Sequence, residues 1–493
     1  MIYEDATSAA INAAMQNAWL AFEQYKKLSL KKRASFLRAI ATGLENAGDE
    51  LISTAMQETN LPEARLKNEK ARTVFQLTSY ADACEKGDWL EIRIDTAIPD
   101  KTPPKPDIRK MLVPLGPVVV FGSSNFPFAY STAGGDTATA LAAGCPVIVK
   151  AHPAHADTST LVADIINDAA LQTQMPDNVF THLYGASFEV GKALVLHEYT
   201  KAVGFTGSYV GGKQLFDWGN QRKEPIPVFA EMGSINPVFL LPEKLKTSTE
   251  AIAGMYAGSI TLGVGQFCTN PGLIIGIEGE SLQLFINTLS KEISNISPAK
   301  MLHAGIAKAF NEKRNKAVKQ SNVGIVADVA NTTGDPLCGA ATIATTDAKT
   351  FLENKILHEE VFGPYSLVVA CKNMNEMIEV AKHLEGQLTA TLMATENDII
   401  NNDSLIETVK NICGRFILNG VPTGVEVCLS MHHGGPFPST TDSQYTSVGA
   451  DAIKRFARPI AFQNWPDSLL PDELKNDNPL KINRTVNNIL TVA

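Results

Sequence analysis

The first ninety residues repeat apolar positions at the spacing of amphipathic helices. This pattern predicts helices over Thr7–Leu30, Lys31–Ala47 and Leu51–Thr59, and a further helix that ends near Lys86. The Leu61-Pro62-Glu63 segment predicts the break before that last helix. These segments carry no grouping of reactive side chains, so we expect them to cover a sheet.

Residues Trp89–Val113 follow a different pattern. Two strand-like runs, Ile92–Ile98 and Ile108–Val113, flank the proline-rich segment Pro99–Pro106. Proline cannot donate to a strand ladder, so this segment predicts a hairpin and not the interior of a sheet.

From Pro117 onward, strand and helix patterns alternate, which predicts a parallel sheet with helices on both faces. Gly144 is expected to end the first of these helices and Asp157 to cap the second. A second α/β unit begins after Asn236. The expected strands are 118–121, 146–150, 179–184, 201–205, 227–230, 273–277 and 365–370, with another ending at 419–420; the expected helices are 130–143, 158–171, 249–262, 282–294 and 307–320.

Length and composition narrow the class of protein. A chain of 493 residues favours two or three domains, and 44% hydrophobic with 19% charged residues is typical of soluble globular proteins. The net charge of −9 argues against a nucleic-acid or acidic membrane surface. No apolar run approaches the ~18 residues of a membrane span, and the N-terminus lacks the pattern of a signal peptide. Seven scattered cysteines fit a reducing cytoplasm and offer no metal-ligand spacing.

Cys268 is the candidate nucleophile. It lies in Gly265-Gln-Phe-Cys-Thr-Asn-Pro271, between the end of a helical pattern and a strand. A cysteine at such a corner can be constrained by the backbone and partly open to a cleft, which suits a reactive thiol. The alternative is a small buried hydrophobe, the ordinary role of cysteine.

Two other stretches favour chemistry at Cys268. Glu231 ends an apolar run in Phe229-Ala-Glu-Met-Gly-Ser-Ile-Asn-Pro237, and Asn125 lies in a turn after strand 118–121. The three residues offer a nucleophile, a base and an oxyanion donor. The adjacent histidines 432 and 433 could suggest a metal pair, but neighbouring residues point in different directions, so we interpret them as structural.

The expected ends of three strands place Lys150, Gly207 and Glu231 at one crevice, because parallel sheets bind ligands beyond the carboxyl ends of their strands. The Gly-x-Gly-x-x-Gly motif of dinucleotide-binding proteins is missing. Instead Gly207-Ser208 opens a helix, where phosphates could approach the helix N-terminus. The alternative for this segment is a turn and helix cap without a ligand.

Four motifs taken together resemble the aldehyde dehydrogenase superfamily in order and spacing. They are Asn125-Phe-Pro, Glu231-x-Gly-x-x-x-Pro, Gly265-Gln-x-Cys and Glu360-Val-Phe-Gly-Pro364, and the resemblance covers nearly the whole chain. It implies an α/β fold of three parts: a Rossmann-type dinucleotide-binding domain (1–95 and 115–235), a catalytic domain (236–450) and an oligomerisation arm with a tail (96–114 and 451–493).

The resemblance also implies roles for residues. Cys268 attacks the aldehyde, the Asn125 amide stabilises the oxyanion, and Glu231 activates the water that releases the acid; a glutamate suits this work if burial raises its pKa toward the operating pH. No metal is implied. The cofactor is NADP or NAD. Lys150 would contact the adenosine ribose, Gly207 and Ser208 the pyrophosphate, Glu360 the nicotinamide ribose, and Phe362 the nicotinamide ring.

The resemblance leaves four functions to compare. Segment Asn419–Ser443 is similar to 2-oxoglutarate semialdehyde (2,5-dioxopentanoate) dehydrogenases, and also to NADP-linked fatty aldehyde dehydrogenases. A catalytically silent homologue would have lost Cys268 or Glu231, and an acyl-CoA-forming relative would lack Glu231. We expect a small aldehyde as substrate and a homodimer or homotetramer. Residues that could meet a substrate carboxylate are Arg415, Thr423, His432 and Ser439.

The residue three positions after Lys150 bears on the cofactor. Many NAD-preferring relatives carry a glutamate there, which repels a 2′-phosphate, whereas this chain has Pro153. A carboxylate ~4 Å from a phosphate charge would cost roughly 1–4 kcal/mol. The sequence therefore predicts that NADP⁺ is used at least as well as NAD⁺, unless another loop supplies a carboxylate.

Overall fold

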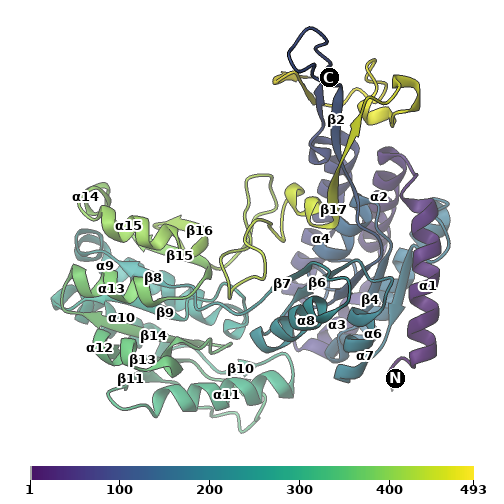
Figure 1. The fold of residues 1–493 in the computed structure, drawn as a ribbon. Coiled ribbons are helices and arrows are strands. Elements are labelled where there is room, and N and C mark those ends of the chain that lie inside the picture. Colours follow the sequence, from purple (N-terminus) through teal and green to yellow (C-terminus); the bar gives the residue numbers. More distant parts are fainter. Residues whose placement is uncertain (1–2, 493) are drawn as a thin grey trace.

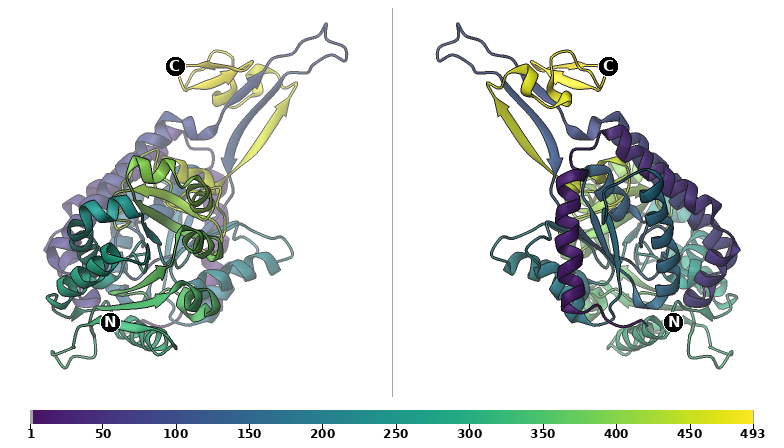
Figure 2. Two further views of the ribbon diagram at one scale, coloured as in Figure 1. Left: turned by 90° about the vertical axis from the view of Figure 1, so that its left-hand side faces the viewer. Right: turned by 90° about the vertical axis from the view of Figure 1, so that its right-hand side faces the viewer.

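The computed structural model describes residues 3–492. Figure 1 shows two α/β lobes side by side, with a narrow β arm that projects from the first of them and carries the C-terminal end. The arm stands clear of both lobes in the two side views of Figure 2. No helix in the described range is long and apolar enough to span a membrane.

The sheet of the first lobe has five parallel strands in the order β5-β4-β3-β6-β7. Successive side chains face opposite layers of helices, as expected for a sheet covered on both faces. Val119, Ile148 and Val203 pack with one helical layer, while Val118 and Val149 pack with the other. The strands are β3 (Val118–Phe121), β4 (Val147–Lys150), β5 (Phe180–Leu183), β6 (Ala202–Thr206) and β7 (Val228–Glu231).

The helices of this lobe fall into those two layers. Buried residues of α1, α7 and α8 share one hydrophobic core, and buried residues of α2, α3, α4, α5 and α6 share the other. Their bounds are α1 Ser8–Tyr25, α2 Leu30–Asn46, α3 Asp49–Thr59, α4 Glu63–Lys86, α5 Gly135–Ala143, α6 Ala156–Gln172, α7 Phe188–Leu196 and α8 Tyr209–Gln221.

Three of the expected helix boundaries are wrong. The first helix ends at Tyr25, because the Ser29 side chain caps a new helix by accepting from the backbone N–H of Lys32. The helix expected from Tyr130 begins only at Gly135, after a run of turns. Asp157 is not an N-cap but lies in the first turn of α6; the carboxylate that accepts from its backbone N–H comes from Glu58 on α3, at 2.9 Å.

The second lobe contains a seven-stranded sheet in the order β11-β13-β14-β9-β8-β15-β16, in which only β11 is antiparallel. One core lies under α9 and α10 and another under α11, α12, α13 and α15. The strands are β8 Val238–Leu240, β9 Leu273–Ile277, β11 Gly324–Asp328, β13 Thr342–Asp347, β14 Tyr365–Cys371, β15 Gln387–Met393 and β16 Cys413–Leu418. The helices are α9 Pro242–Thr261, α10 Glu280–Ser294, α11 Ala304–Val318, α12 Ala348–Glu353, α13 Met374–His383, α14 Glu396–Ile400 and α15 Asp403–Lys410, and β10 (Ala299–Lys300) pairs with β12 (Cys338–Gly339).

The arm is a sheet in the order β17-β2-β1-β18-β19. The hairpin expected from the proline-rich segment is present, since β1 (Arg93–Asp95) pairs antiparallel with β2 (Ile108–Pro114). Strand β1 thus belongs to the arm sheet, although the sequence placed residue 95 at the end of the cofactor domain. The C-terminal part of the chain adds β17 Ala457–Gln463, β18 Arg484–Val486 and β19 Ile489–Thr491.

Candidate active site

Cys268 lies in an irregular loop between α9 and β9. The backbone turns sharply there, with positive φ at Gly263, Val264 and Gly265. A Cβ on Gly265 would lie only 2.3 Å from the backbone carbonyl of Gly363, so only glycine fits at this contact. The cysteine loop therefore packs directly against the Glu360–Pro364 motif, which is distant in sequence.

Two asparagine side chains hold the cysteine loop in place. The Asn236 amide donates to the carbonyls of Cys268 and Asn270, both at 2.9 Å. The Asn125 amide donates to the carbonyl of Gln266 at 3.2 Å. Both asparagines are buried. The Asn125 amide carries a second N–H, so its position beside the loop is compatible with the expected role as oxyanion donor.

Glu231 ends β7 at the carboxyl edge of the first sheet, facing the cysteine loop. Segment 439–441 runs antiparallel to this strand end: the N–H of Met232 donates to the carbonyl of Ser439, and that of Thr441 to the carbonyl of Ala230. This pairing brings the chain around residue 433 into the crevice between the lobes. Ser447 then donates to Glu231 Oε2 at 2.8 Å and fixes the carboxylate.

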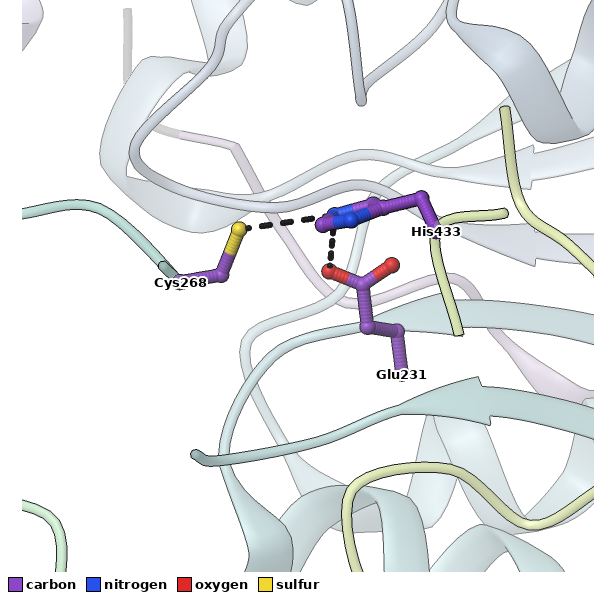
Figure 3. Close-up of side chains that lie close together, drawn as sticks. All are labelled: Glu231, Cys268 and His433. Atoms are coloured by element: carbon purple, nitrogen blue, oxygen red, sulfur yellow. Dashed lines mark hydrogen bonds and ion pairs between the residues drawn. The ribbon is translucent and has the colours of Figure 1, made fainter. Parts of the chain in front are cut away.

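His433 lies between the nucleophile and the carboxylate (Figure 3). Its Nε2 atom is 3.6 Å from Cys268 Sγ and 3.0 Å from Glu231 Oε1. The imidazole is almost fully buried, with 1% of its surface exposed. The interpretation of the histidine pair as structural is therefore wrong for His433, while His432 is half-buried outside this cluster.

The hydrogen bonds at His433 indicate how the proton can move. Nε2 contacts both the thiol sulfur and Glu231 Oε1, whereas Nδ1 of His433 makes no hydrogen bond among the described residues. In the tautomer that carries its proton on Nδ1, Nε2 can accept the S–H proton. The resulting imidazolium would be paired with the Glu231 carboxylate 3.0 Å away. Both contacts are made to the same ring nitrogen, so the carboxylate stabilises the imidazolium beside the sulfur and does not orient the ring through the opposite nitrogen.

Burial and these neighbours shift the two acidic groups in opposite directions. Burial, followed by the nearby Glu231 carboxylate, raises the pKa of the Cys268 thiol well above its ordinary value. Burial alone would also raise the pKa of Glu231, but the charge and hydrogen bonds of His433 and Ser447 lower it below its ordinary value. The condition of a raised pKa for Glu231 is therefore not met. The thiol needs a base within reach, and His433 is in that position.

Cys268, Glu231 and His433 also form a group of possible metal ligands, with one ligand atom of each within 4.8 Å of the others. A thiol, an imidazole and a carboxylate can coordinate Zn²⁺. The same three groups can instead form a nucleophile with its base. The cluster lies at the carboxyl ends of the parallel strands, where such sheets bind their substrates, and this position favours the nucleophile over the metal site.

The residues expected to hold the cofactor lie at the carboxyl ends of the first sheet and across the crevice. Lys150 ends β4, and its Nζ donates to the carbonyl of Gly185 at 2.5 Å. Gly207 and Ser208 are exposed at the start of α8, where the Ser208 side chain caps the helix. An exposed helix N-terminus and a lysine beside the same sheet edge fit the anionic pyrophosphate of a dinucleotide.

Glu360 approaches the crevice from the second lobe. Its Oε1 accepts a long hydrogen bond of 3.4 Å from the backbone N–H of Ser234, and a Cβ on Gly233 would lie 2.6 Å from its Oε2. Burial raises the pKa of Glu360 to about 7. Phe362 and Glu360 line a small cleft together with Phe267, next to the nucleophile. A carboxylate and an aromatic side chain in this cleft are compatible with the expected binding of the nicotinamide ribose by Glu360 and of the nicotinamide ring by Phe362.

The fold, the four motifs and the site agree with the comparison to known proteins. The model of the aldehyde dehydrogenase family matches residues 2–456. The chain therefore belongs to the aldehyde dehydrogenase family and is an oxidoreductase.

Two curated relatives are similar over nearly the whole chain. The α-ketoglutaric semialdehyde dehydrogenase 2 of Azospirillum brasilense is 47% identical, with 98% of this chain and 92% of the relative covered. The α-ketoglutaric semialdehyde dehydrogenase of Acinetobacter baylyi is 42% identical, with 99% and 93% covered. Among solved structures, 3,6-anhydro-L-galactose dehydrogenase in complex with NAP has the same fold, with a TM-score of 0.80, 20% identity and coverage of 93% and 92%.

Proposed function

We propose that this protein oxidises 2,5-dioxopentanoate (α-ketoglutaric semialdehyde) to 2-oxoglutarate with a nicotinamide cofactor. The contact of Cys268 with His433, beside Glu231, carries the chemistry of this proposal. The substrate is supported by the two curated relatives and by the Asn419–Ser443 segment.

The reaction begins at the thiol. His433 Nε2 takes the proton of Cys268, the sulfur forms a bond to the aldehyde carbon, and the carbonyl electrons move onto the oxygen. The Asn125 amide and the backbone N–H of Cys268 stabilise this oxyanion, a contribution that is typically ~2.7–4 kcal/mol per donor. When bound, the cofactor supplies the oxidising power that converts the thiohemiacetal into a thioester.

The second half of the reaction releases the acid. Glu231 takes a proton from water while the water oxygen bonds to the thioester carbon. The carbon–sulfur bond then breaks, and the thiolate is regenerated. Because the pKa of Glu231 lies below its ordinary value, this carboxylate is ionised at neutral pH and ready to act as a base.

We expect the enzyme to prefer a short aldehyde that carries a carboxylate over neutral or long-chain aldehydes. For wild-type enzyme, kcat/KM for 2,5-dioxopentanoate should exceed that for pentanal, a neutral aldehyde of the same length, by about ten- to a hundredfold, the usual effect of one or two hydrogen bonds to a charged group. Steady-state rates with these two aldehydes and with decanal test the proposal. A preference for decanal would assign the enzyme to fatty aldehydes.

The cofactor is NADP or NAD, and we propose that NADP⁺ is used at least as well as NAD⁺. Pro153 supports this, since it places no carboxylate after Lys150. In the structure, however, the carboxylate of Asp5 lies against the loop next to Lys150. Asp5 Oδ1 accepts from the backbone N–H of Ala186 at 2.6 Å, on the loop whose Gly185 carbonyl binds Lys150.

Exchanging Asp5 for asparagine should therefore raise the NADP⁺/NAD⁺ ratio of kcat/KM by about two- to fivefold. The size is small because Asp5 is exposed and its charge is screened by solvent. Dissociation constants of both cofactors, measured by calorimetry, provide a readout independent of turnover. A preference of more than about tenfold for NAD⁺ in the wild-type enzyme and in Asp5→Asn would refute the interpretation of Pro153.

We also propose a cytoplasmic homodimer or homotetramer. All seven cysteines are free, which supports a reducing compartment. The arm supports assembly because it projects from the lobes and ends in exposed Ile489 and Leu490. Sedimentation equilibrium measures the assembly, and a monomer would contradict it.

A further inference from the structure

Two arginines from different lobes converge beside the nucleophile. Arg72 lies on α4 of the first lobe, and Arg415 on β16 of the second. Arg72 Nη2 donates to the Tyr130 hydroxyl at 3.3 Å, and its guanidinium lies 5.3 Å from the centre of the Tyr130 ring. The Tyr130 ring in turn lies 6.4 Å from the imidazole of His433.

Both guanidinium groups hold the same irregular segment after β16. Arg415 donates to the carbonyls of Pro422 and Gly424, and Arg72 donates to the carbonyl of Val425 at 3.4 Å. This segment therefore joins the two arginines into one unit that bridges the lobes. Figure 1 shows the chain after β16 crossing from one lobe to the other.

The charges of Arg72 and Arg415 are coupled to that of the Cys268 thiol. Burial and Glu231 raise the pKa of the thiol, and Arg72 counteracts them. Burial lowers the pKa of Arg415, while the charges of Cys268 and Tyr130 act in the opposite direction. The contacts from Arg72 to Tyr130, and from the Tyr130 ring to His433, give the geometric link between this pair and the site of attack.

The two arginines retain hydrogen-bonding capacity. A guanidinium has five N–H donors. The Arg415 Nε–H is buried without an acceptor in the described chain, and the two bonds from Arg72 are long. Within residues 3–492, neither arginine forms an ion pair with a carboxylate, whereas the nearby Arg65 lies 3.9 Å from Glu69. Two half-buried cations that make no ion-pair contact with a carboxylate of the described chain are suited to an anionic ligand.

We propose that Arg72 and Arg415 form the subsite that binds the carboxylate of the aldehyde substrate, a proposal that rests on the proposed function. In 2,5-dioxopentanoate the aldehyde and the carboxylate are at opposite ends of a five-carbon chain. With the aldehyde at Cys268, the carboxylate end must lie away from the sulfur. Glu231, together with the ionised fraction of Glu360, makes the surroundings of the nucleophile negative, so an acidic substrate requires a local cationic group.

The other residues considered for this role have different surroundings. Thr423 shares a hydrogen bond of 3.0 Å with Ser259, and buried Ser439 donates to the carbonyl of Pro436 at 2.8 Å. Their hydroxyls are therefore already engaged. His432 is half-buried, and burial lowers its pKa, so it is uncharged at neutral pH. Arg415 is the candidate from the sequence that the structure favours, and Arg72 is added to it.

The test compares two aldehydes of equal length in each variant. Arg72→Gln and Arg415→Gln should each lower kcat/KM for 2,5-dioxopentanoate by about ten- to a hundredfold, mainly through KM, and change kcat/KM for pentanal by less than about threefold. Arg415→Lys should recover part of the loss, because it keeps the charge but not the planar fork. Glutarate, as a dead-end inhibitor, should bind more weakly by a similar factor in both glutamine variants.

Arg38→Gln is the matched control, because it also removes one positive charge but from exposed ion pairs with Asp82 and Glu85 on the outer helices. It should leave the preference unchanged. If Arg72→Gln and Arg415→Gln weaken both aldehydes equally, the arginines only position the loop and the subsite proposal is wrong. If wild-type enzyme itself does not prefer the acidic aldehyde, the proposed function fails instead. Thermal unfolding of each variant shows whether it is folded.

Discussion

Replacing Cys268 with alanine is expected to abolish aldehyde oxidation, with a loss of about 10⁴-fold or more in kcat, as is usual when a covalent nucleophile is removed. The alanine variant cannot form the thiohemiacetal, and the water or His433 that remains cannot replace the sulfur. The rate of NADPH or NADH formation with 2,5-dioxopentanoate measures the effect.

The fold and the cofactor site should persist in this variant. Cys268 is only half-buried, and the contacts that Asn236 makes to its loop are to backbone carbonyls. Calorimetry should give the same cofactor affinity as wild type. Cys428→Ala, at an exposed cysteine, serves as the control and should retain full activity. Turnover by Cys268→Ala equal to that of wild type would remove the basis of the whole mechanism.

Exchanging Glu231 for glutamine is expected to separate the two halves of the reaction. Steady-state turnover should fall by about 10²–10³-fold, because the thioester loses the base that activates water. The burst of reduced cofactor in the first turnover should be slowed by no more than about tenfold, through loss of the carboxylate that pairs with His433. Rapid mixing resolves the burst from the steady state.

His433→Asn is the matched comparison, since it removes the base next to the thiol and keeps Glu231. It should slow the burst itself by about 10²-fold, and activity should recover partly at high pH, where the thiol ionises without help. A Glu231→Gln enzyme that lost its burst but hydrolysed thioester normally would reverse the roles given to the two residues.

Much of the framework could be predicted from local patterns. Strand 118–121 and strand 273–277 are observed with the expected bounds, because a short apolar run between turn residues has few other ways to bury its side chains. The corner position of Cys268 was equally visible, since a helical pattern ends before it and a strand begins after it. The family itself was evident from four short motifs.

The helix boundaries that were predicted wrongly depend on contacts with residues distant in sequence. Ala-rich residues before Gly144 suggested a helix that began at Tyr130, but in the fold Tyr130 lies in a turn that places its ring near Arg72 and His433. The cap of α6 came from Glu58, about 100 residues earlier in the chain. Helix propensity contains no information about such contacts.

The chemistry of the site shows most clearly what the sequence by itself determined and what only the tertiary structure decided. The sequence determined the candidate nucleophile, the candidate carboxylate and the succession of two α/β units, because these follow from residue types, spacing and hydrophobic periodicity. The tertiary structure placed His433 in contact with Cys268, although 165 residues of chain separate the two. It also set the direction of the pKa shift of Glu231, since a pKa depends on burial and on the charges nearby in space, and these are established only when the two lobes and the segment between them come together.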